Sequence, residues 1–323
     1  MRILIILPNW LGDALMATPA IEHLCALHPE AKLTFVGSYV SIEAIKHHPQ
    51  AEASFVDDTK KKGWRLKNTQ TFAQGLGEFD IAITFRNNIY STLMLLFTPA
   101  RLKIARKSWH ASLLLDKTKK LPNTIHLSEQ YNELVNLIDK NPSGAPKSKL
   151  YIPKKEYDQP TLGINPGATY GSAKRWYPEK FAEVAKAFAS QYQIIIFGGP
   201  TEIDMGADIE KRLQEMGITN YQNLAGKTSV QELCSYIGGL DIFITNDSGP
   251  MHVAASYEVP TVAIFGPTRH NETCQWRNEK SRLVRRDDVP CAPCMKRSCP
   301  LKHHECMTKI EANDVIKAVK ELV

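Results

Sequence analysis

The stretch RILIILPNWLGDALMATP, residues 2–19, decides the fold of the first part of the chain. After the first arginine it begins with an unbroken apolar run, which is typical of a parallel β-strand buried on both faces. A turn at Gly12 follows, and residues 14–27 carry apolar side chains at helical spacing. Turns of this kind often bind phosphate at the N-terminus of the helix, yet Asp13 places a carboxylate there. The role of that carboxylate is therefore the first functional question.

The alternation of strand and helix continues through the first half of the chain. A helix is expected at residues 126–139, where Ser128 is placed to cap the N-terminus. Further strands are expected at residues 32–38, 53–58, 79–86 and 101–107.

A change in composition separates this half from the next. The segment KNPSGAPKSK, residues 140–149, is rich in Pro, Gly, Ser and Lys and is typical of an interdomain linker. After it the alternation starts again. Two successive alternations predict an α/β protein with two Rossmann-like, doubly wound domains, residues 1–145 and 150–323, that face a central cleft. In the second half, strands are expected at 161–167, 193–199, 240–247 and 261–267, and helices at 178–191, 202–216, 229–238, from 249, and at 311–322.

The composition is that of a globular protein. The chain has 323 residues, enough for two hydrophobic cores, of which 43% are hydrophobic and 23% charged. No run of eighteen apolar residues occurs, which argues against a membrane span. The apolar run at the N-terminus is too short for a signal peptide, and Trp10 and Asp13 follow it too soon. We therefore expect a cytoplasmic protein.

Positive charge gathers in the first half. The net charge of +6 does not by itself indicate a nucleic-acid partner. A solvated surface explains any single cluster of lysines and arginines equally well, but three clusters in one half favour an anionic partner. The clusters are Lys60, Lys61, Lys62, Arg65 and Lys67; Arg101, Lys103, Arg106 and Lys107; and Lys117, Lys119 and Lys120.

Glycine-rich and polar segments follow four expected strands of the second half. Glycine turns that open helices present backbone N–H groups to phosphate, and Lys174 adds a positive charge. Glu202 is suited to accept hydrogen bonds from ribose hydroxyls. Because the carboxyl ends of parallel strands lie along one edge of a sheet, the combination favours a nucleotide diphosphate site. The segments are INPGATYGSAKRW (164–176), FGGPTE (197–202), TNDSGPMHVAA (245–255) and FGPT (265–268).

Each of these side chains also has a purely structural explanation. Asp247 and Ser248 can cap a helix. His252 can be a hydrogen-bonded core residue, and Glu202 can be a first-turn helix charge. Neither a GxGxxG nor a P-loop pattern occurs, which argues against NAD and ATP sites.

The motifs together resemble a known family. NDSGPMHVAA followed by FGPT, with PNWLGDALMATPA near the N-terminus, is similar to the ADP-heptose:lipopolysaccharide heptosyltransferases. The NWLGDALMATPA, GATYGSAKRW and CAPCMKRSCPLKHHECM stretches most resemble the type II members. The resemblance covers essentially the whole chain and is weakest between residues 40 and 150. It implies a GT-B type fold, with the C-terminal helix packed back on the first domain, and an inverting, metal-independent glycosyltransferase without a cofactor.

The resemblance also implies roles for single residues. Asp13 matches the base that accepts the proton of the acceptor hydroxyl across the cleft, and its alternative role is a carboxylate stabilised by the helix dipole. The second domain is expected to bind ADP-L-glycero-β-D-manno-heptose, with Lys174 stabilising the leaving diphosphate. The implied donor-binding residues are Thr169, Tyr170, Ser172 and Lys174 at the pyrophosphate, Glu202 at the ribose, Thr228 near the adenine, Asp247 at the heptose, and Ser248, Gly249 and His252 around diphosphate and sugar.

The implied acceptor is the inner core of lipopolysaccharide, lipid A bearing Kdo and a first heptose. Its carboxylates and phosphates suit the basic first half. Because this acceptor lies in the inner membrane, peripheral attachment to the anionic inner face is expected, at about 1 kcal/mol per well-placed cation. The candidate acceptor contacts are Lys61, Lys62, Arg65 and Arg86.

Seven cysteines occur, four of them close together near the C-terminus. Cys25 and Cys234 lie in helical patterns and are expected to be buried. A disulfide framework is not expected in a cytosolic chain, and the spacing of the other four is not a standard zinc pattern. Ordinary thiols are therefore favoured over a structural zinc at Cys291, Cys294, Cys299 and Cys306.

Other functions stay open on the sequence alone. One is a type I heptosyltransferase or another ADP-sugar transferase, and another is a sugar-nucleotide epimerase of the same fold, in which the basic first half has no evident purpose. A nucleic-acid-binding module is the third, but it leaves the glycine turns unexplained, and no nucleic-acid partner is expected.

Overall fold

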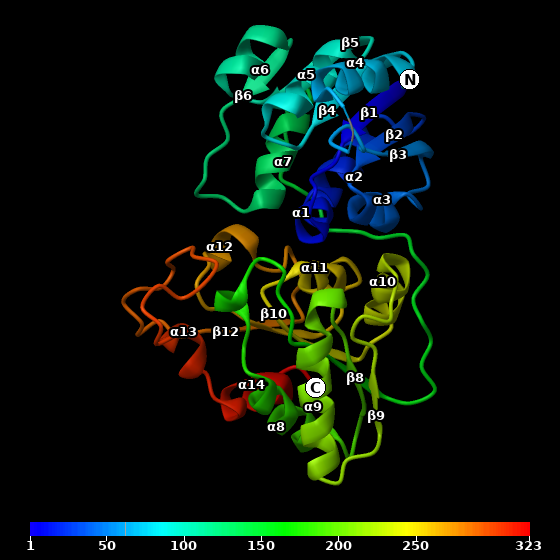
Figure 1. The fold of residues 1–323 in the computed structure, drawn as a ribbon. Coiled ribbons are helices and arrows are strands. Elements are labelled where there is room, and N and C mark those ends of the chain that lie inside the picture. The colour runs from blue at the N-terminus through cyan, green and yellow to red at the C-terminus, as the bar shows by residue number, and fades with distance from the viewer. Residues whose placement is uncertain (62) are drawn as a thin grey trace. The chain divides into compact units, whose positions relative to one another are not determined.

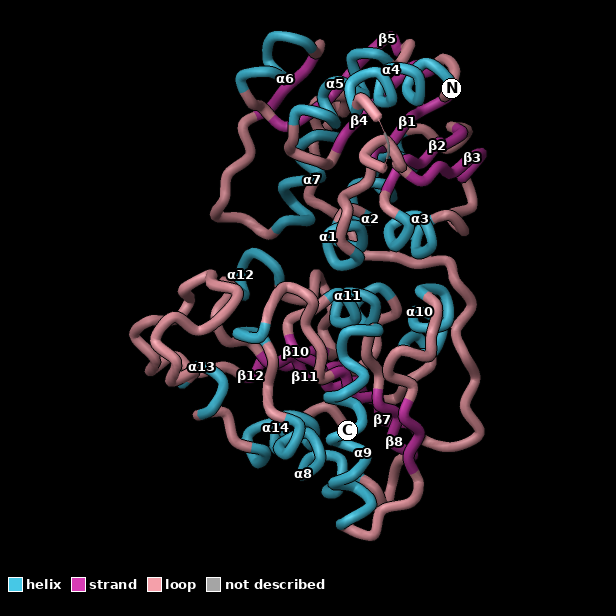
Figure 2. Tube along the Cα trace, viewed as in Figure 1, coloured by secondary structure: helices cyan, strands magenta, loops and turns pink. Residues whose placement is uncertain are grey.

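The chain forms two compact units, Met1–Tyr151 and Ile152–Val323. The computed structural model describes residues 1–61 and 63–323, so the candidate contact Lys62 lies outside the described residues. Each unit holds one six-stranded sheet, and every described strand pair is parallel. Helices connect the strands within each unit, as Figures 1 and 2 show by chain colour and by secondary structure. The expected α/β class with two doubly wound sheets is confirmed.

The sheet of the first unit has the order β3-β2-β1-β4-β5-β6. The chain therefore builds outward from β1 in one direction and then restarts beside β1 with β4. This reversal makes a topological switch point, where ligands of open α/β sheets bind. The strands are β1 (Arg2–Ile6), β2 (Lys32–Gly37), β3 (Ala51–Val56), β4 (Phe79–Thr84), β5 (Ala100–Arg106) and β6 (Lys117–Lys119).

Helices cover this sheet on both faces because β1 buries its alternate side chains on opposite sides. Leu4 and Ile6 of β1 pack in one cluster with Ala73 and Met94, which come from α4 and α5. The helices are α1 (Leu11–Met16), α2 (Thr18–Leu27), α3 (Tyr39–Ile45), α4 (Arg65–Gly75), α5 (Ile89–Phe97), α6 (Trp109–Leu114) and α7 (Leu127–Val135).

Two helix predictions of the first half are wrong in detail. The single helix expected at 14–27 is divided into α1 and α2 at Ala17. Helix α2 begins with a Thr-Pro pair, and the N–H that proline lacks is not needed in a first turn. Ser128 does not cap α7. The N-cap is His126, whose Nδ1 accepts a hydrogen bond from the backbone N–H of Ser128 at 3.1 Å.

The second unit repeats the topology of the first. Its order, β12-β11-β10-β7-β8-β9, places the switch point between β7 and β10. The strands are β7 (Thr161–Asn165), β8 (Gln193–Ile196), β9 (Tyr221–Asn223), β10 (Ile242–Asn246), β11 (Thr261–Ile264) and β12 (Ser281–Val284). The helices are α8 (Pro178–Phe188), α9 (Ile203–Glu215), α10 (Val230–Gly238), α11 (Gly249–Ser256), α12 (His270–Thr273), α13 (Glu305–Thr308) and α14 (Ala312–Lys320), with 3-10 turns η1 (Ser172–Lys174) and η2 (Pro200–Glu202).

The core of the second unit lies between the sheet and α8, α9 and α14. Trp176 is fully buried there, and its indole N–H donates to the carbonyl of Ile310 at 3.1 Å. Val315 and Val319 of α14 are buried in the same cluster. The final helix thus packs against its own unit, and its return to the first domain stays a prediction. Within the described residues, no helix is both long enough and apolar enough to cross a bilayer.

Candidate functional site

The switch point of the first unit borders a pocket of about 220 Å³. Asp13 lines it from the first turn of α1, the helix that follows β1, and Arg86 lines it from the segment after β4. Asp13 therefore fits both its proposed role as a base and its alternative role at a helix N-terminus. The other lining residues are Pro8, Asn9, Trp10, Phe85, Asn87, Asn88, Arg106, Leu121, Leu127, Gln130, Tyr131 and Leu134.

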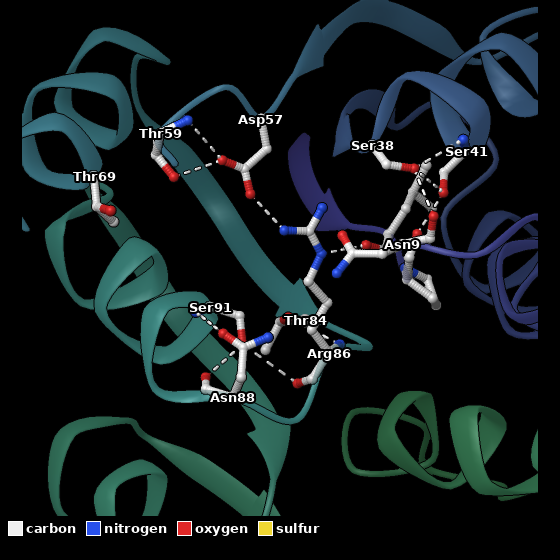
Figure 3. A network of polar contacts seen from close by, with 12 residues as sticks. Asn9, Ser38, Ser41, Asp57, Thr59, Thr69, Thr84, Arg86, Asn88 and Ser91 are labelled. Carbon is white, nitrogen blue, oxygen red and sulfur yellow. Dashed lines mark hydrogen bonds and ion pairs between the residues drawn. The ribbon is translucent and has the colours of Figure 1, made fainter. Parts of the chain in front are cut away.

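The loop that leads into α1 is held by the end of the neighbouring strand. Ser41 Oγ donates to the carbonyl of Pro8 at 2.5 Å, and Ser38 Oγ donates to that of Asn9 at 2.7 Å. Ser38 is also the N-cap of α3, so its position is fixed by the helix itself. Figure 3 shows these serines beside Asn9. The loop backbone before Asp13 is therefore anchored on the N-terminus of α3.

Arg86 lies in a buried ion pair. Its Nη1 is 2.5 Å from Asp57 Oδ2, and both side chains are less than a tenth exposed. Its Nε donates to the carbonyl of Leu7 at 2.6 Å, while Nη2 is buried and has no hydrogen-bond partner in the part of the chain described. Asp57 also accepts from the backbone and hydroxyl of Thr59 (Figure 3). The pocket therefore has a fixed cation whose charge is already balanced and which keeps one donor group unused.

Tyr131 brings a neutral hydroxyl to the same pocket from α7. Burial, and then the negative charge of Asp13, raise the pKa of Tyr131 well above its usual value, and Arg106 acts in the opposite direction. The phenol therefore stays protonated as a hydrogen-bond donor. Sequence reasoning did not single out Tyr131 or the pocket role of Arg106, because a helical tyrosine gives no signal of its own.

Lys61 and Arg65, the other acceptor candidates that the structure describes, are not among the residues that line this pocket. Lys61 is largely exposed and pairs with Asp58 at 2.8 Å. Arg65 begins α4, where its guanidinium lies 3.5 Å from the centroid of the Tyr90 ring. Their role as acceptor contacts stays a prediction.

At the switch point of the second unit, Asp247 contacts residues from the segments that follow the two neighbouring strands. Its carboxylate lies 2.5 Å from Lys174 Nζ, and the two side chains are 4% and 12% exposed. Thr268 Oγ1 donates to the same carboxylate at 2.5 Å. The residues follow β7, β10 and β11, which lie next to one another in the sheet. Thr268 belongs to the FGPT segment but had no role assigned from the sequence.

Ser248 is the N-cap of α11, yet its side chain makes no capping hydrogen bond. Its hydroxyl instead lies 3.2 Å from Asn165 Nδ2. The explanation of this side chain as a mere cap is therefore wrong. Gly249 begins α11, Pro250 follows without an N–H, the N–H of Met251 donates to the carbonyl of Ser248 at 3.1 Å, and His252 is buried one turn further on.

Glu202 lies against the glycine turn after β7. It is 5% exposed, and its Oε2 accepts from the backbone N–H of Gly199 at 2.7 Å. Its Oε1 is buried and has no hydrogen-bond partner among the described residues. A Cβ added to Gly167 would lie 2.1 Å from this carboxylate, so only glycine fits there. The carboxylate thus keeps an acceptor free at the strand ends.

The remaining donor candidates lie in the same unit. Thr169 and Ser172 are exposed in the segment after β7, and Tyr170 donates its hydroxyl to the carbonyl of Met295 at 2.8 Å. Thr228 is half-buried in the loop between β9 and α10. The structure therefore gathers the second-half candidates along the carboxyl edge of one sheet.

The cysteines divide into two kinds. Cys234 is buried as expected, whereas Cys25 is only half-buried, and burial raises the pKa of each to about 12. In the chain as described, no three His, Cys, Asp or Glu side chains form a group that could hold a metal ion. Cys291, Cys294, Cys299 and Cys306 instead line one small apolar pocket.

The comparisons with known proteins agree with this geometry. The family model described as "Glycosyltransferase family 9 (heptosyltransferase)" matches residues 70–305. A Campylobacter jejuni protein named lipooligosaccharide heptosyltransferase 2 is 36% identical over 100% of this chain and 98% of its own length.

Solved structures show the same fold. The structure of E. coli ADP-heptose lps heptosyltransferase II has a TM-score of 0.82 at 23% identity and covers 100% of this chain and 98% of its own. That of E. coli heptosyltransferase WaaC with ADP has a TM-score of 0.79 at 17% identity and covers 100% of both chains. The expected GT-B type fold, two Rossmann-like sheets in one chain, is thereby confirmed.

Proposed function

The chain belongs to glycosyltransferase family 9, the heptosyltransferases, and on that premise we propose that it is the type II enzyme of lipopolysaccharide core synthesis. In this function it transfers L-glycero-D-manno-heptose from ADP-heptose to the heptosyl-Kdo inner core. The observation that carries the proposal is that the two sheets hold different functional groups at equivalent places in the fold. One sheet presents Asp13 at its switch point, and the other presents Lys174 and Asp247.

The second unit is the proposed donor domain. Lys174 and the backbone N–H of Gly249 at the start of α11 suit the diphosphate of ADP-heptose. Because Lys174 is paired with Asp247, the diphosphate must share or take over this cation, which leaves the Asp247 carboxylate to accept hydrogen bonds from heptose hydroxyls. The unused Oε1 of Glu202 is suited to a ribose hydroxyl. Thr169, Tyr170, Ser172, Thr228, Ser248, Gly249 and His252 complete the proposed donor site.

The proposed reaction is a direct, inverting displacement. The acceptor hydroxyl attacks the anomeric carbon of the heptose as the bond to ADP breaks, and Asp13 accepts the proton of that hydroxyl. Lys174 and the N–H of Gly249 stabilise the charge that develops on the leaving diphosphate, so the reaction needs no metal ion. General-base assistance is typically worth roughly 10²–10⁴-fold in rate.

The first unit is the proposed acceptor domain. Arg86 offers its unused Nη2, and Arg106 lines the same pocket, which suits a carboxylate or phosphate of the inner core. Lys61, Lys62 and Arg65 are further proposed contacts. The acceptor is anchored in the inner membrane, so we place the enzyme in the cytoplasm with peripheral attachment by charge.

Replacing Asp13 tests the mechanism. Asp13→Asn is expected to lower turnover by at least about 100-fold because the proton acceptor is lost, while ADP binds with unchanged affinity because the donor residues lie in the other unit. Turnover with ADP-heptose and a defined core acceptor is measured beside calorimetric titration of ADP. The matched control is Glu30→Gln, which neutralises an exposed carboxylate of the same unit. Near-normal turnover in Asp13→Asn would remove this residue from the mechanism.

The nucleotide preference tests the donor. A ligand that binds only the folded protein stabilises it by roughly RT ln(1 + [L]/Kd). We expect ADP to raise the melting temperature and UDP to leave it nearly unchanged. A preference for UDP contradicts the proposal and favours a different transferase or an epimerase.

A further inference from the structure

The cysteine-rich segment, residues 291–306, packs directly on the donor loop, residues 166–175. The backbone N–H of Ala173 donates to the carbonyl of Arg297 at 3.1 Å. A Cβ added to Gly171 would lie 2.2 Å from the same carbonyl oxygen, so glycine is required for this close approach. Together with the hydrogen bond from the Tyr170 hydroxyl to Met295, these contacts fix the donor loop from outside the sheet.

His304 adds a bridge from the same segment. Its Nε2 lies 2.8 Å from the carbonyl of Ala173, which can only accept, so Nε2 carries the proton. The Tyr177 hydroxyl lies 2.9 Å from Nδ1 and donates to it when the ring is neutral. The two contacts join the 3-10 turn that carries Lys174 to the start of α8.

The segment is itself anchored at the donor edge of the sheet. The backbone N–H of Met295 donates to the carbonyl of Pro267 at 2.8 Å, next to Thr268, which holds Asp247. Cys306 is buried, and its thiol lies near those of Cys291, Cys294 and Cys299, all of which line one apolar pocket. Burial, and then these three thiols, raise the pKa of Cys306 to about 11. The four cysteine side chains thus pack together within the segment.

Arg297 is presented by this segment at the donor loop. Its guanidinium carbon lies 5.3 Å from the centroid of the Tyr170 ring, and Lys174 Nζ lies 4.7 Å from the same centroid. Lys174 is neutralised by Asp247. Arg297 is exposed and makes no ion pair with a carboxylate in residues 1–61 or 63–323. Lys174 and Arg297 therefore lie beside the same tyrosine ring, and of these two cations only Lys174 is balanced by a carboxylate.

We propose that Arg297 is a further donor-binding residue, a second cation that the cysteine-rich segment supplies to the diphosphate of the ADP-sugar. The inference rests on the proposed function, since it needs a nucleoside diphosphate at the donor loop. A guanidinium can bind two phosphate oxygens at once, which an ammonium group cannot do with the same geometry. Because the charge of Lys174 is already balanced by Asp247, Arg297 supplies the diphosphate with a second positive charge.

Calorimetric titration of ADP and of adenosine tests the assignment in the full-length protein. Arg297→Gln is expected to weaken ADP binding about tenfold or more, with little change for adenosine, because only the diphosphate loses a charge-assisted contact. Arg297→Lys should recover part of the loss. The matched control is Lys296→Gln, which removes the same charge from the neighbouring exposed position and should leave ADP binding within about twofold of wild type.

The outcomes separate the two proposals. If wild-type protein binds no ADP, the proposed function fails before Arg297 is tested. If wild type binds ADP and Arg297→Gln binds it within twofold, the assignment of Arg297 is overturned while the proposed function stands. An equal loss of ADP and adenosine, or an equal loss in Lys296→Gln, also overturns it, since the effect is then not specific to the diphosphate or to this side chain.

Discussion

At the residue scale, the buried ion pair of Asp57 with Arg86, which lines the Asp13 pocket, is expected to stabilise the fold. Removing one partner of a buried pair leaves the other charge uncompensated, at a cost of about 3 kcal/mol or more. Asp57→Asn is therefore expected to lower the free energy of unfolding by about 3 kcal/mol, measured by urea denaturation. The control Asp58→Asn breaks only an exposed pair with Lys61 and should cost less than about 1 kcal/mol.

The same pair predicts a pH dependence. Burial opposes ionisation of Asp57, but the hydrogen bonds and charge supplied by Thr59 and Arg86 outweigh it and hold the pKa below its usual value. A carboxyl whose folded pKa is depressed contributes stability above its unfolded pKa, about 3.9, and loses it as the pH falls through the folded pKa. We expect the unfolding free energy of wild type to fall more steeply below about pH 4 than that of Asp57→Asn. Equal slopes of the unfolding free energy against pH in this acidic range, in wild type and Asp57→Asn, would contradict this.

A substitution at Gly167 tests the donor site without changing any charge. A methyl group at this position meets the Glu202 carboxylate, so Gly167→Ala should displace that carboxylate and weaken ADP binding about tenfold. Removing the Glu202 carboxylate tests whether the loss is steric. Glu202→Ala alone and the double variant Gly167→Ala/Glu202→Ala should bind ADP equally. Gly75→Ala, whose added methyl meets nothing within 4 Å, is the control and should leave ADP binding unchanged. Additive losses in the double variant would argue against the steric explanation.

Candidate site residues could be predicted from the sequence where polar residues stand in the segment that follows an apolar strand. Asp13, Lys174 and Asp247 were found in this way, because strand ends of parallel sheets collect at one edge. Their partners could not be found, since Thr268 and Tyr131 reach them only through the tertiary fold. Arg86 was predicted as an acceptor contact on charge alone, and its burial against Asp57 depends on which strands become neighbours.

At the element scale, the central strands were predictable because strands buried on both faces are unbroken apolar runs. The edge strands β6, β9 and β12 were not predicted, since they are three or four residues long and carry polar side chains. The helices α3, α4 and α5 were also missed. Helix α5, with the sequence IYSTLMLLF, contains no charged residue, so it lacks the charged face that marks an amphipathic helix in a sequence.

The final helix α14 supplies a prediction at this scale. Val315 is fully buried in the core of the second unit between the sheet and α8. Val315→Ala removes two methylene-sized groups from a close-packed site and should lower the free energy of unfolding by about 2 kcal/mol. Lys317→Ala changes an exposed position of the same helix and should have little effect. Chemical denaturation of both variants measures this, and equal stabilities would mean that α14 is not part of the cooperative core.

At the scale of the whole molecule, the chain repeats one sheet topology in two units whose functional side chains differ in charge. Both sheets have the same strand order about their first strand. The first sheet presents an acidic side chain in a pocket with Arg86 and Tyr131, and the second presents a lysine held by Asp247 and Thr268. In the proposed transfer the acidic group accepts a proton as the cationic group receives the leaving diphosphate, so neither unit is sufficient alone.

This division predicts how the molecule behaves when it is cut. Residues 152–323 contain a complete six-stranded sheet, its helices and all the proposed donor contacts. Expressed alone, this unit should unfold cooperatively and bind ADP within about tenfold of the full-length affinity, because a ligand site built within one domain does not need the other. It should show no transfer, since Asp13 is missing. Lys174→Ala in the same fragment is the control that should lose ADP binding while it keeps the cooperative transition. A fragment that folds but does not bind ADP would mean that the first unit contributes to the donor site directly, and the assignment of the donor to the second unit alone would then be wrong.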